Sequence, residues 1–288
     1  MSSRGTVVCL HGFPDGPATF DPLRELLECD GYEVVTPYLP GHHPTTTHTF
    51  ATRRRQEGTL LAAANQLAED YIAPLASGPA PIHLIGHDWG AILGFVLASR
   101  FSRYLTTYTS LAIPPLLDPV GGLVRHPAAI LRFDYIAAFQ VPLLGEQLLT
   151  SRLFLDRLAR RWSPSLTLPP KLTDDVDARY ADPSVRREVL AYYRAPFSPR
   201  ELASTWRLLA AFPAVPTLVL HGDKDGCFPA NSFPTAIASA RRRTTTPLTL
   251  TSLPGVGHFP QLEAPAAVYL AWRKHVAATI AAVSPRTR

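Results

Sequence analysis

Residues 85–90 read Ile-Gly-His-Asp-Trp-Gly, and this hexapeptide constrains the fold more than any other part of the sequence. The apolar residues 81–85 are typical of a short buried strand, and residues 90–100 are typical of a helix without breakers. A sharp strand-to-helix turn strains its central residue, Asp88, and flanking side chains larger than glycine would collide with the strand and helix. The N-terminus of the helix favours an anion here. Asp88 is therefore a candidate nucleophile; the simpler alternative is a helix N-cap.

The rest of the chain alternates strand-like and helical segments, which is typical of a parallel sheet covered by helices. We expect strands at residues 6–10, 33–36, 81–85, 217–220 and 246–253, and helices at 20–29, 59–73, 90–100 and 264–282. Between these groups the chain shows helical patches broken by prolines and no convincing strand. We predict an α/β fold with a mostly parallel central sheet. Its core comprises residues 1–113 and 208–288, and a helical lid of residues 114–207 is inserted between them.

Three further motifs follow strands in an informative order. His-Gly-Phe-Pro at 11–14 follows the first strand, His-Gly-Asp-Lys-Asp at 221–225 follows a later one, and Gly-His at 257–258 follows the last. The order nucleophile, acid, histidine is that of the α/β-hydrolase fold. We predict Asp225, rather than the turn residue Asp223, as the acid and His258 as the histidine.

The same fold forms its oxyanion hole from two backbone amides. One belongs to the loop after an early strand and the other to the residue after the nucleophile. In this sequence the two donors would be the amides of Phe13 and Trp89.

Over nearly its whole length the chain resembles the epoxide hydrolases of the α/β-hydrolase fold. The resemblance rests on HGFP, GHDWG, GDKD and GHFPQLEAP, and on two lid segments, residues 133–142 and 191–194. It implies that Tyr135 and Tyr193 face the nucleophile, with Tyr192 as the alternative to Tyr193; the simpler reading of each is a packed aromatic. The sequence departs from the family pattern at residues 39–43, where an arginine-glycine turn is common, and in a lid segment one residue longer before its glycine.

Carboxylate chemistry agrees with this resemblance. An aspartate, with a reference pKa of about 3.9, is already ionised at neutral pH and can displace a leaving group at saturated carbon. Asp88 would open an epoxide and form an alkyl ester. The departing alkoxide needs a proton, which Tyr135 and Tyr193 could donate because tyrosine has a pKa of about 10.

The second half of the expected reaction is hydrolysis of the ester. His258, oriented by Asp225, would act as the general base on a water molecule. The amides of Phe13 and Trp89 would hold the oxyanion. The partners are a small apolar epoxide, bound against Phe13, Trp89 and the two tyrosines, and water; no cofactor and no metal is required.

Composition argues against other classes of function. The chain has 28 Lys and Arg against 23 Asp and Glu, a net charge of +5, and the only basic runs are residues 53–55 and 241–243. A nucleic-acid site needs a clustered basic face, so we expect none. We expect neither a signal peptide nor a membrane span, and hence a cytoplasmic enzyme. The three cysteines lack metal-site spacing. The oligomeric state stays open, a homodimer included.

Four other functions are the alternatives. A haloalkane dehalogenase would use the same Asp elbow, with Trp89 and a second donor, either Trp162 or Trp206, for the halide. A fluoroacetate-type dehalogenase would carry Arg after the nucleophile, where this chain has Trp89. A non-catalytic binding protein would be expected to lose triad residues, and an esterase would need an unusual elbow.

Overall fold

A computed structural model describes residues 3–116 and 132–283 of the chain. Its centre is a single sheet of six parallel strands in the order β2-β1-β3-β4-β5-β6. The sheet therefore has the predicted α/β architecture. The strands are β1 (Thr6–Leu10), β2 (Glu33–Val35), β3 (Ile82–His87), β4 (Thr107–Leu111), β5 (Thr217–Gly222) and β6 (Leu248–Leu253).

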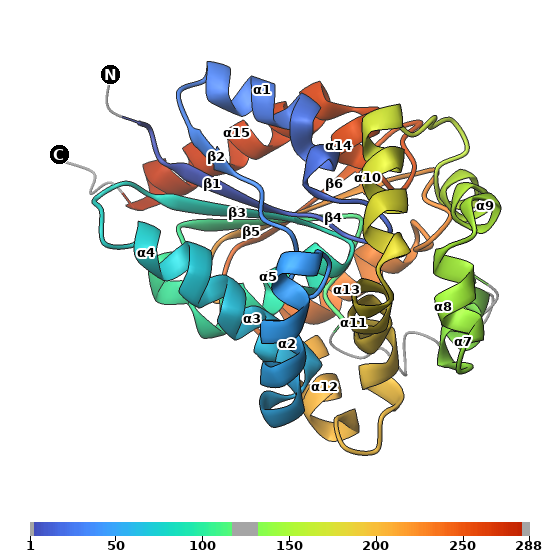
Figure 1. The fold of residues 1–288 in the computed structure, drawn as a ribbon. Helices are drawn as coiled ribbons and strands as arrows, with labels where there is room; N and C mark the ends of the chain where they lie inside the picture. Colours follow the sequence, from blue (N-terminus) through green and yellow to red (C-terminus); the bar gives the residue numbers. More distant parts are fainter. Residues whose placement is uncertain (1–2, 117–131, 284–288) are drawn as a thin grey trace, which may run out of the picture.

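Helices cover both faces of the sheet, which explains the continuous apolar runs in β1 and β5. In β1, Val7 and Cys9 join one apolar cluster, whereas Val8 and Leu10 join another on the opposite face. Helices α1 (Asp21–Cys29), α14 (Pro260–Glu263) and α15 (Pro265–Val283) lie on the first face, and α3 (Thr59–Leu67), α5 (Trp89–Arg100) and α13 (Ser232–Arg241) lie on the second (Figure 1). None of the helices in the described ranges combines the length and the apolar character of a membrane span.

Strand β4 was not predicted, and it occupies the middle of the sheet between β3 and β5. Its sequence, Thr-Tyr-Thr-Ser-Leu, lacks the apolar run that marks a buried strand. All five residues are nevertheless buried. Two of its hydroxyl groups bind backbone carbonyls: the Tyr108 hydroxyl donates to that of Ala91 at 2.6 Å, and the Ser110 hydroxyl donates to that of Ile113 at 2.7 Å.

Helix α2 (Pro44–Glu57) also lies outside the predicted elements because it has no apolar stripe. It is held by contacts from far along the chain. The ring of Phe50 stacks on Tyr192 with centroids 5.6 Å apart, and Arg54 forms an ion pair with the buried Glu188. The predicted helix at 59–73 continues past Pro74 to Leu75 through a π-helical turn.

Helices fill the described part of the chain between β4 and β5, and we call residues 132–209 the helical insertion. Its helices between Asp134 and Arg194 lie beyond the carboxyl ends of the strands, whereas the last one packs against α3 and α5 (Figure 1). Its helices are α7 (Asp134–Gln140), α8 (Leu144–Leu149), α9 (Arg152–Trp162), α10 (Pro170–Ala181), α11 (Pro183–Arg194) and α12 (Leu202–Leu209). The predicted lid boundaries, 114 and 207, stay a prediction, and part of the segment after 114 lies outside the described residues.

The strand order places a switch point between β1 and β3. From β1 the chain passes outward to β2, whereas from β3 it proceeds in the other direction through β4, β5 and β6. In parallel α/β sheets, ligands bind outside the carboxyl ends of the strands at such a point. The loops after β1 and β3 carry Phe13 and Asp88, two of the predicted site residues.

Gly90 permits the close contact between α5 and β1 at this point. A Cβ atom at Gly90 would lie 2.1 Å from the carbonyl oxygen of Leu10 and 2.4 Å from that of His11. Alanine normally favours a helix over glycine by about 1 kcal/mol. We expect Gly90→Ala instead to lower the free energy of unfolding by about 1–3 kcal/mol, the range for overpacked cores. Urea unfolding would measure this change.

Gly78→Ala is the matched control, because a Cβ atom there would meet its nearest neighbour, the carbonyl oxygen of Leu75, at an ordinary 3.6 Å. Equal stability of the Gly90→Ala and Gly78→Ala proteins would contradict the packing argument.

Candidate active site

Asp88 stands between β3 and α5 in a conformation that L-amino acids rarely adopt, with φ 48° and ψ −119°. Such strain persists only where the surrounding structure enforces it. The close packing of strand on helix does so, because a Cβ atom at Gly86 would lie 2.4 Å from the carbonyl oxygen of Gly90. The turn thus fixes a carboxylate at the N-terminus of a helix, in a position that is 5% exposed.

One carboxylate oxygen of Asp88 already has a backbone donor. The amide of Phe13 donates to Oδ1 of Asp88 at 2.9 Å. Gly12 allows the loop to come this close, since a Cβ atom there would lie 2.4 Å from Cβ of Asp88. Trp89 is the first residue of α5, so its amide has no acceptor within the helix. The Phe13 amide therefore contacts the carboxylate directly, whereas the Trp89 amide stays a predicted second donor.

His258 and Asp225 meet the other side of Asp88. Nε2 of His258 lies 3.6 Å from Oδ2 of Asp88, and Nδ1 lies 2.9 Å from Oδ2 of Asp225. The amides of Cys227 and Phe228 donate to Oδ1 of Asp225 and fix its orientation. By contrast, Oδ1 of the neighbouring Asp223 accepts a hydrogen bond from the amide of Gly255, in the turn after β6.

Two carboxylates control the charge of His258. Burial lowers the pKa of its imidazole, but Asp225 and Asp88 oppose this effect and raise the pKa to about 10. The imidazole is therefore protonated at neutral pH. Loss of either negative charge would lower the pKa of His258.

Tyr135 of α7 and Tyr193 of α11 converge on the same space, with ring centroids 5.9 Å apart. The ring of Tyr193 lies 5.1 Å from that of Trp89 and 5.4 Å from that of Phe13. Burial, with a further contribution from the Asp88 carboxylate, raises the pKa of both phenols well above the usual range, so both are protonated. Among the described residues, the buried hydroxyl of Tyr193 has no hydrogen-bond partner.

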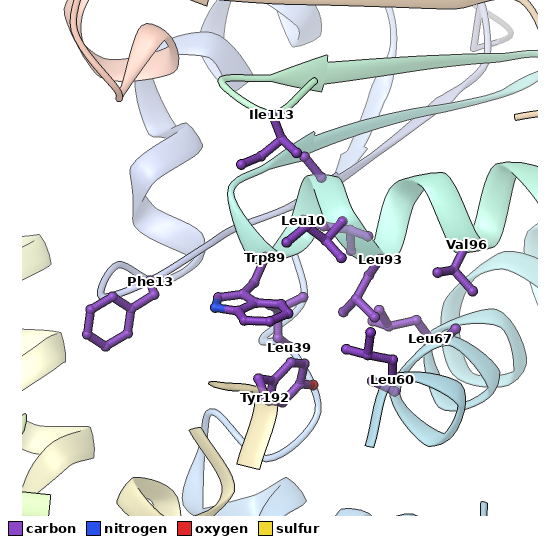
Figure 2. Packing of buried hydrophobic residues seen from close by; sticks show 14 of the residues in the cluster. Leu10, Phe13, Leu39, Leu60, Leu67, Trp89, Leu93, Val96, Ile113 and Tyr192 are labelled. Atoms are coloured by element: carbon purple, nitrogen blue, oxygen red, sulfur yellow. The ribbon is translucent and has the colours of Figure 1, made fainter. Parts of the chain in front are cut away.

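Tyr192 has a different environment from Tyr193. Its hydroxyl donates to the carbonyl of Pro40 at 2.8 Å, and its ring packs beneath the indole of Trp89 among core leucines (Figure 2). The structure thus brings together Asp88, Asp225, His258, Tyr135, Tyr193, Phe13 and Trp89, and it leaves Tyr192 in the core.

The end of helix α9 supports the histidine, a role that the sequence did not indicate. The carbonyl of Trp162 accepts hydrogen bonds from the amides of Gly226 and His258, at 3.0 and 3.2 Å. The hydroxyl of Ser163 accepts from the His258 amide at 2.7 Å and donates to Glu263. These contacts join the helical insertion to the acid loop and the histidine loop. Apart from the side chains of Ser163 and Glu263, they use backbone atoms, which leave no sequence signal.

A buried carboxylate, Asp15, contacts the elbow through His87, the residue before Asp88. It lies between two imidazoles, with Oδ1 3.8 Å from Nδ1 of His11 and Oδ2 3.5 Å from Nδ1 of His87. Burial raises its pKa, but the two histidines outweigh this effect and lower it well below the usual range. Nε2 of His87 in turn contacts the carbonyl oxygen of His258 at 2.8 Å. Asp15 was not among the predicted site residues.

The three cysteines and the acidic residues do not form a metal site in the described ranges, where no group of three His, Cys, Asp or Glu side chains is placed to hold an ion. Burial raises the pKa of the Cys227 thiol well above its usual value, so this group beside Asp225 is protonated.

A strained residue after the third strand, with an acid and a histidine after later parallel strands, defines the α/β-hydrolase fold. Residues 7–272 match the profile of the alpha/beta hydrolase family, and the chain belongs to this family. Membership in this family supports hydrolase activity.

Curated relatives confirm the resemblance to epoxide hydrolases. A mouse (Mus musculus) protein named epoxide hydrolase 3 is 26% identical over 261 residues, covering 87% of this chain and 64% of its own length. The chain thus spans slightly less than two thirds of that relative. A Siraitia grosvenorii protein of the same name is 26% identical over 257 residues, covering 78% of this chain and 77% of its own length.

Solved structures confirm the fold. A haloalkane dehalogenase loop variant from Bradyrhizobium elkanii is 21% identical and superposes with a TM-score of 0.72, covering 99% of this chain and 93% of the other. A proposed epoxide hydrolase from Klebsiella pneumoniae is 23% identical with a TM-score of 0.76, covering 95% and 90%.

The raised pKa of His258 predicts a pH dependence of stability. The folded-state value of about 10 lies above the unfolded value of about 6.5. The stabilisation from the charged imidazole is therefore fully present below about pH 6.5 and is lost as the pH rises through about 10. The difference in unfolding free energy between wild type and His258→Gln should shrink over that window, as measured by urea unfolding at several pH values. A difference that is constant with pH would contradict the ion-pair assignment.

Proposed function

We propose that this protein is an epoxide hydrolase that forms an alkyl ester on Asp88 and hydrolyses it to a vicinal diol. The observation that carries the proposal is the pair of buried, protonated tyrosines, Tyr135 and Tyr193, whose rings contact each other and whose pKa values the charge of Asp88 helps to raise. A leaving group that departs as an alkoxide needs such acids, whereas a halide does not. The epoxide hydrolase names of the curated relatives point to the same chemistry.

In the first step Asp88 attacks an epoxide carbon. Oδ1 accepts a hydrogen bond from Phe13, so Oδ2 is the oxygen that forms the C–O ester bond. The C–O bond of the ring breaks, and its oxygen takes a proton from Tyr135 or Tyr193. One substrate carbon is then bound to the enzyme and the other carries a hydroxyl group.

Ester formation also changes His258. The negative charge of Asp88 is lost, and this charge is one of the two that raise the pKa of the imidazole. The imidazolium can then return a proton to the tyrosinate, which leaves a neutral base next to the ester. The same event that creates the ester thus prepares the group that hydrolyses it.

In the second step neutral His258 takes a proton from water, and the hydroxide attacks the ester carbonyl of Asp88. The resulting oxyanion, on Oδ1, is held by the amides of Phe13 and Trp89. Collapse breaks the ester bond, the departing diol oxygen takes the proton of the new carboxyl group, and Asp88 and the imidazolium are restored.

Residues 114–207 would act as a lid over this reaction. The described helices of this segment contribute both tyrosines, and the reacting groups beneath them are almost completely buried. The partners are then a small apolar epoxide, enclosed by aromatic rings, and water.

Haloalkane dehalogenation is the second candidate, because one observation favours it. The indole nitrogen of Trp162 is buried without a hydrogen-bond partner in the described structure, and its ring lies 5.2 Å from that of His258. With Trp89 it could bind a halide. Trp206 is unsuitable, since its indole donates to the carbonyl of Pro196 at 3.0 Å.

Removal of the base should trap the ester. We expect His258→Gln to react once with styrene oxide and to retain the adduct, because only the second step requires a base. Mass spectrometry of the peptide that contains Asp88 should show the added mass, and Asp88→Ala should show none.

An isotope experiment identifies the nucleophile independently. In a single turnover in ¹⁸O-water with enzyme in excess, the diol should be unlabelled and the Asp88 peptide labelled. Labelled diol from the first turnover, with unlabelled protein, would mean that water attacks the epoxide directly and that the proposal is wrong.

The tyrosines should be necessary for ring opening. Tyr135→Phe and Tyr193→Phe should each slow ester formation by up to about 10²–10⁴-fold, the usual contribution of a general acid, and less where one tyrosine compensates for the other. Tyr192→Phe is the matched control, because that hydroxyl is bonded to Pro40, and it should retain turnover. A double variant of the first two tyrosines that keeps wild-type epoxide turnover would exclude their role. Dehalogenation of a bromoalkane that depends on Trp162 would favour the second candidate.

A further inference from the structure

Arg179 of helix α10 reaches out of the helical insertion and binds the oxyanion loop, residues 12–15. Its side chain is only 2% exposed. Nη2 donates to the carbonyl oxygens of Asp15 and Pro14, at 3.0 and 3.3 Å, and Nη1 donates to that of His42 at 3.1 Å. Burial of a guanidinium is costly unless its charge and its donors are satisfied, and these three carbonyls bind both of its Nη groups.

Other groups hold the guanidinium itself. Nε donates to Oδ2 of Asp175, one turn earlier on α10, at 2.8 Å, and the hydroxyl of Tyr38 donates to the other oxygen of that carboxylate at 2.6 Å. The guanidinium also lies 5.4 Å from the ring centre of Tyr180. Gly16 leaves room for this arrangement, because a Cβ atom there would lie 2.5 Å from Oδ2 of Asp175.

The oxyanion loop has a second support on its inner side. Oδ1 of Asp15 accepts the amide hydrogen of Gly12 at 2.9 Å, which closes a tight turn around Phe13. The amide of Phe13 leaves this turn toward Asp88. Arg179 therefore binds two carbonyls of the same turn that presents the Phe13 amide to Asp88.

We propose that Arg179 is a positioning residue that sets the Phe13 amide of the oxyanion hole and so couples the helical insertion to hydrolysis of the ester. This inference rests on the proposed function. Helix α10 carries no reacting group, yet through Arg179 and the carbonyl groups of the oxyanion loop it would control the second half-reaction.

The two half-reactions should respond differently to a change at Arg179. The oxyanion develops on Oδ1 only when water attacks the ester, so the placement of the Phe13 amide matters most in that step. During ring opening the same amide contacts an oxygen that does not form the new bond. A displaced donor should therefore slow hydrolysis and leave alkylation nearly unchanged.

The test compares Arg179→Met and Arg179→Lys with Arg186→Met. Arg186 is a matched control because it binds the carbonyls of Tyr180 and Ala181, which belong to the helical insertion itself, rather than the oxyanion loop. Each variant reacts in a single turnover with styrene oxide, and quenched samples give the rates of ester formation and diol release. The lysine variant keeps the positive charge, but a single ammonium group cannot reproduce the forked contact of the guanidinium with the oxyanion loop and with His42. It also provides the test if the methionine variant does not fold.

We expect Arg179→Met to accumulate the Asp88 ester, with diol release about tenfold slower and ester formation close to the wild-type rate. This is less than the roughly 10²–10³-fold loss for a deleted oxyanion donor, because the amide is displaced rather than removed. Arg179→Lys should give an intermediate effect, and Arg186→Met should match wild type.

The outcomes that overturn the inference are distinct. Equal ester levels in the Arg179 and Arg186 variants, or equal slowing of both steps, would mean that Arg179 has only a structural role. Absence of any adduct, even in His258→Gln, would instead overturn the proposed function and this inference with it.

Discussion

The position of the Asp88 carboxylate depends on a set of backbone approaches that only glycine permits. At φ 48° Asp88 is strained, and the strain is maintained because β1, β3 and α5 pack at distances that exclude a Cβ atom at Gly86 and Gly90. Gly12 allows the oxyanion loop to meet the carboxylate in the same way. Main-chain packing therefore determines where the reacting side chains lie.

The electrostatics of the site follow from this placement. Oδ2 of Asp88 and Oδ2 of Asp225 lie on opposite sides of the His258 imidazole, 3.6 and 2.9 Å from its two nitrogens. Two anions around one buried ring favour its cationic form, which suits a resting enzyme whose nucleophile must stay ionised. In the proposed reaction Asp88 is a neutral ester and His258 is a neutral base when water is activated.

The sequence predicted those parts of the fold and site that have a local signal. The elbow, five of the six strands, and the helices at 20–29, 59–73, 90–100 and 264–282 have such a signal in hydrophobic periodicity or glycine motifs. Strand β4 was missed because hydroxyl-bearing residues interrupt its apolar pattern, and some of these hydroxyls find partners far along the chain: the Thr107 hydroxyl, for example, pairs with Nδ1 of His83 at 2.8 Å. Ser163 and Arg179 could not be predicted either, since their partners in the loops are backbone groups of segments distant in sequence.

The contacts of helix α9 have a consequence for exchanging parts between relatives. The carbonyl of Trp162 accepts from both Gly226 and His258, and a Cβ atom at Gly226 would lie 1.9 Å from the carbonyl oxygen of Arg161. The insertion is thus not a module that can be transplanted to alter substrate range alone. A chimera that receives a foreign insertion also receives a foreign support for its histidine, so its chemistry and its selectivity would change together unless the backbone at the end of α9 is matched.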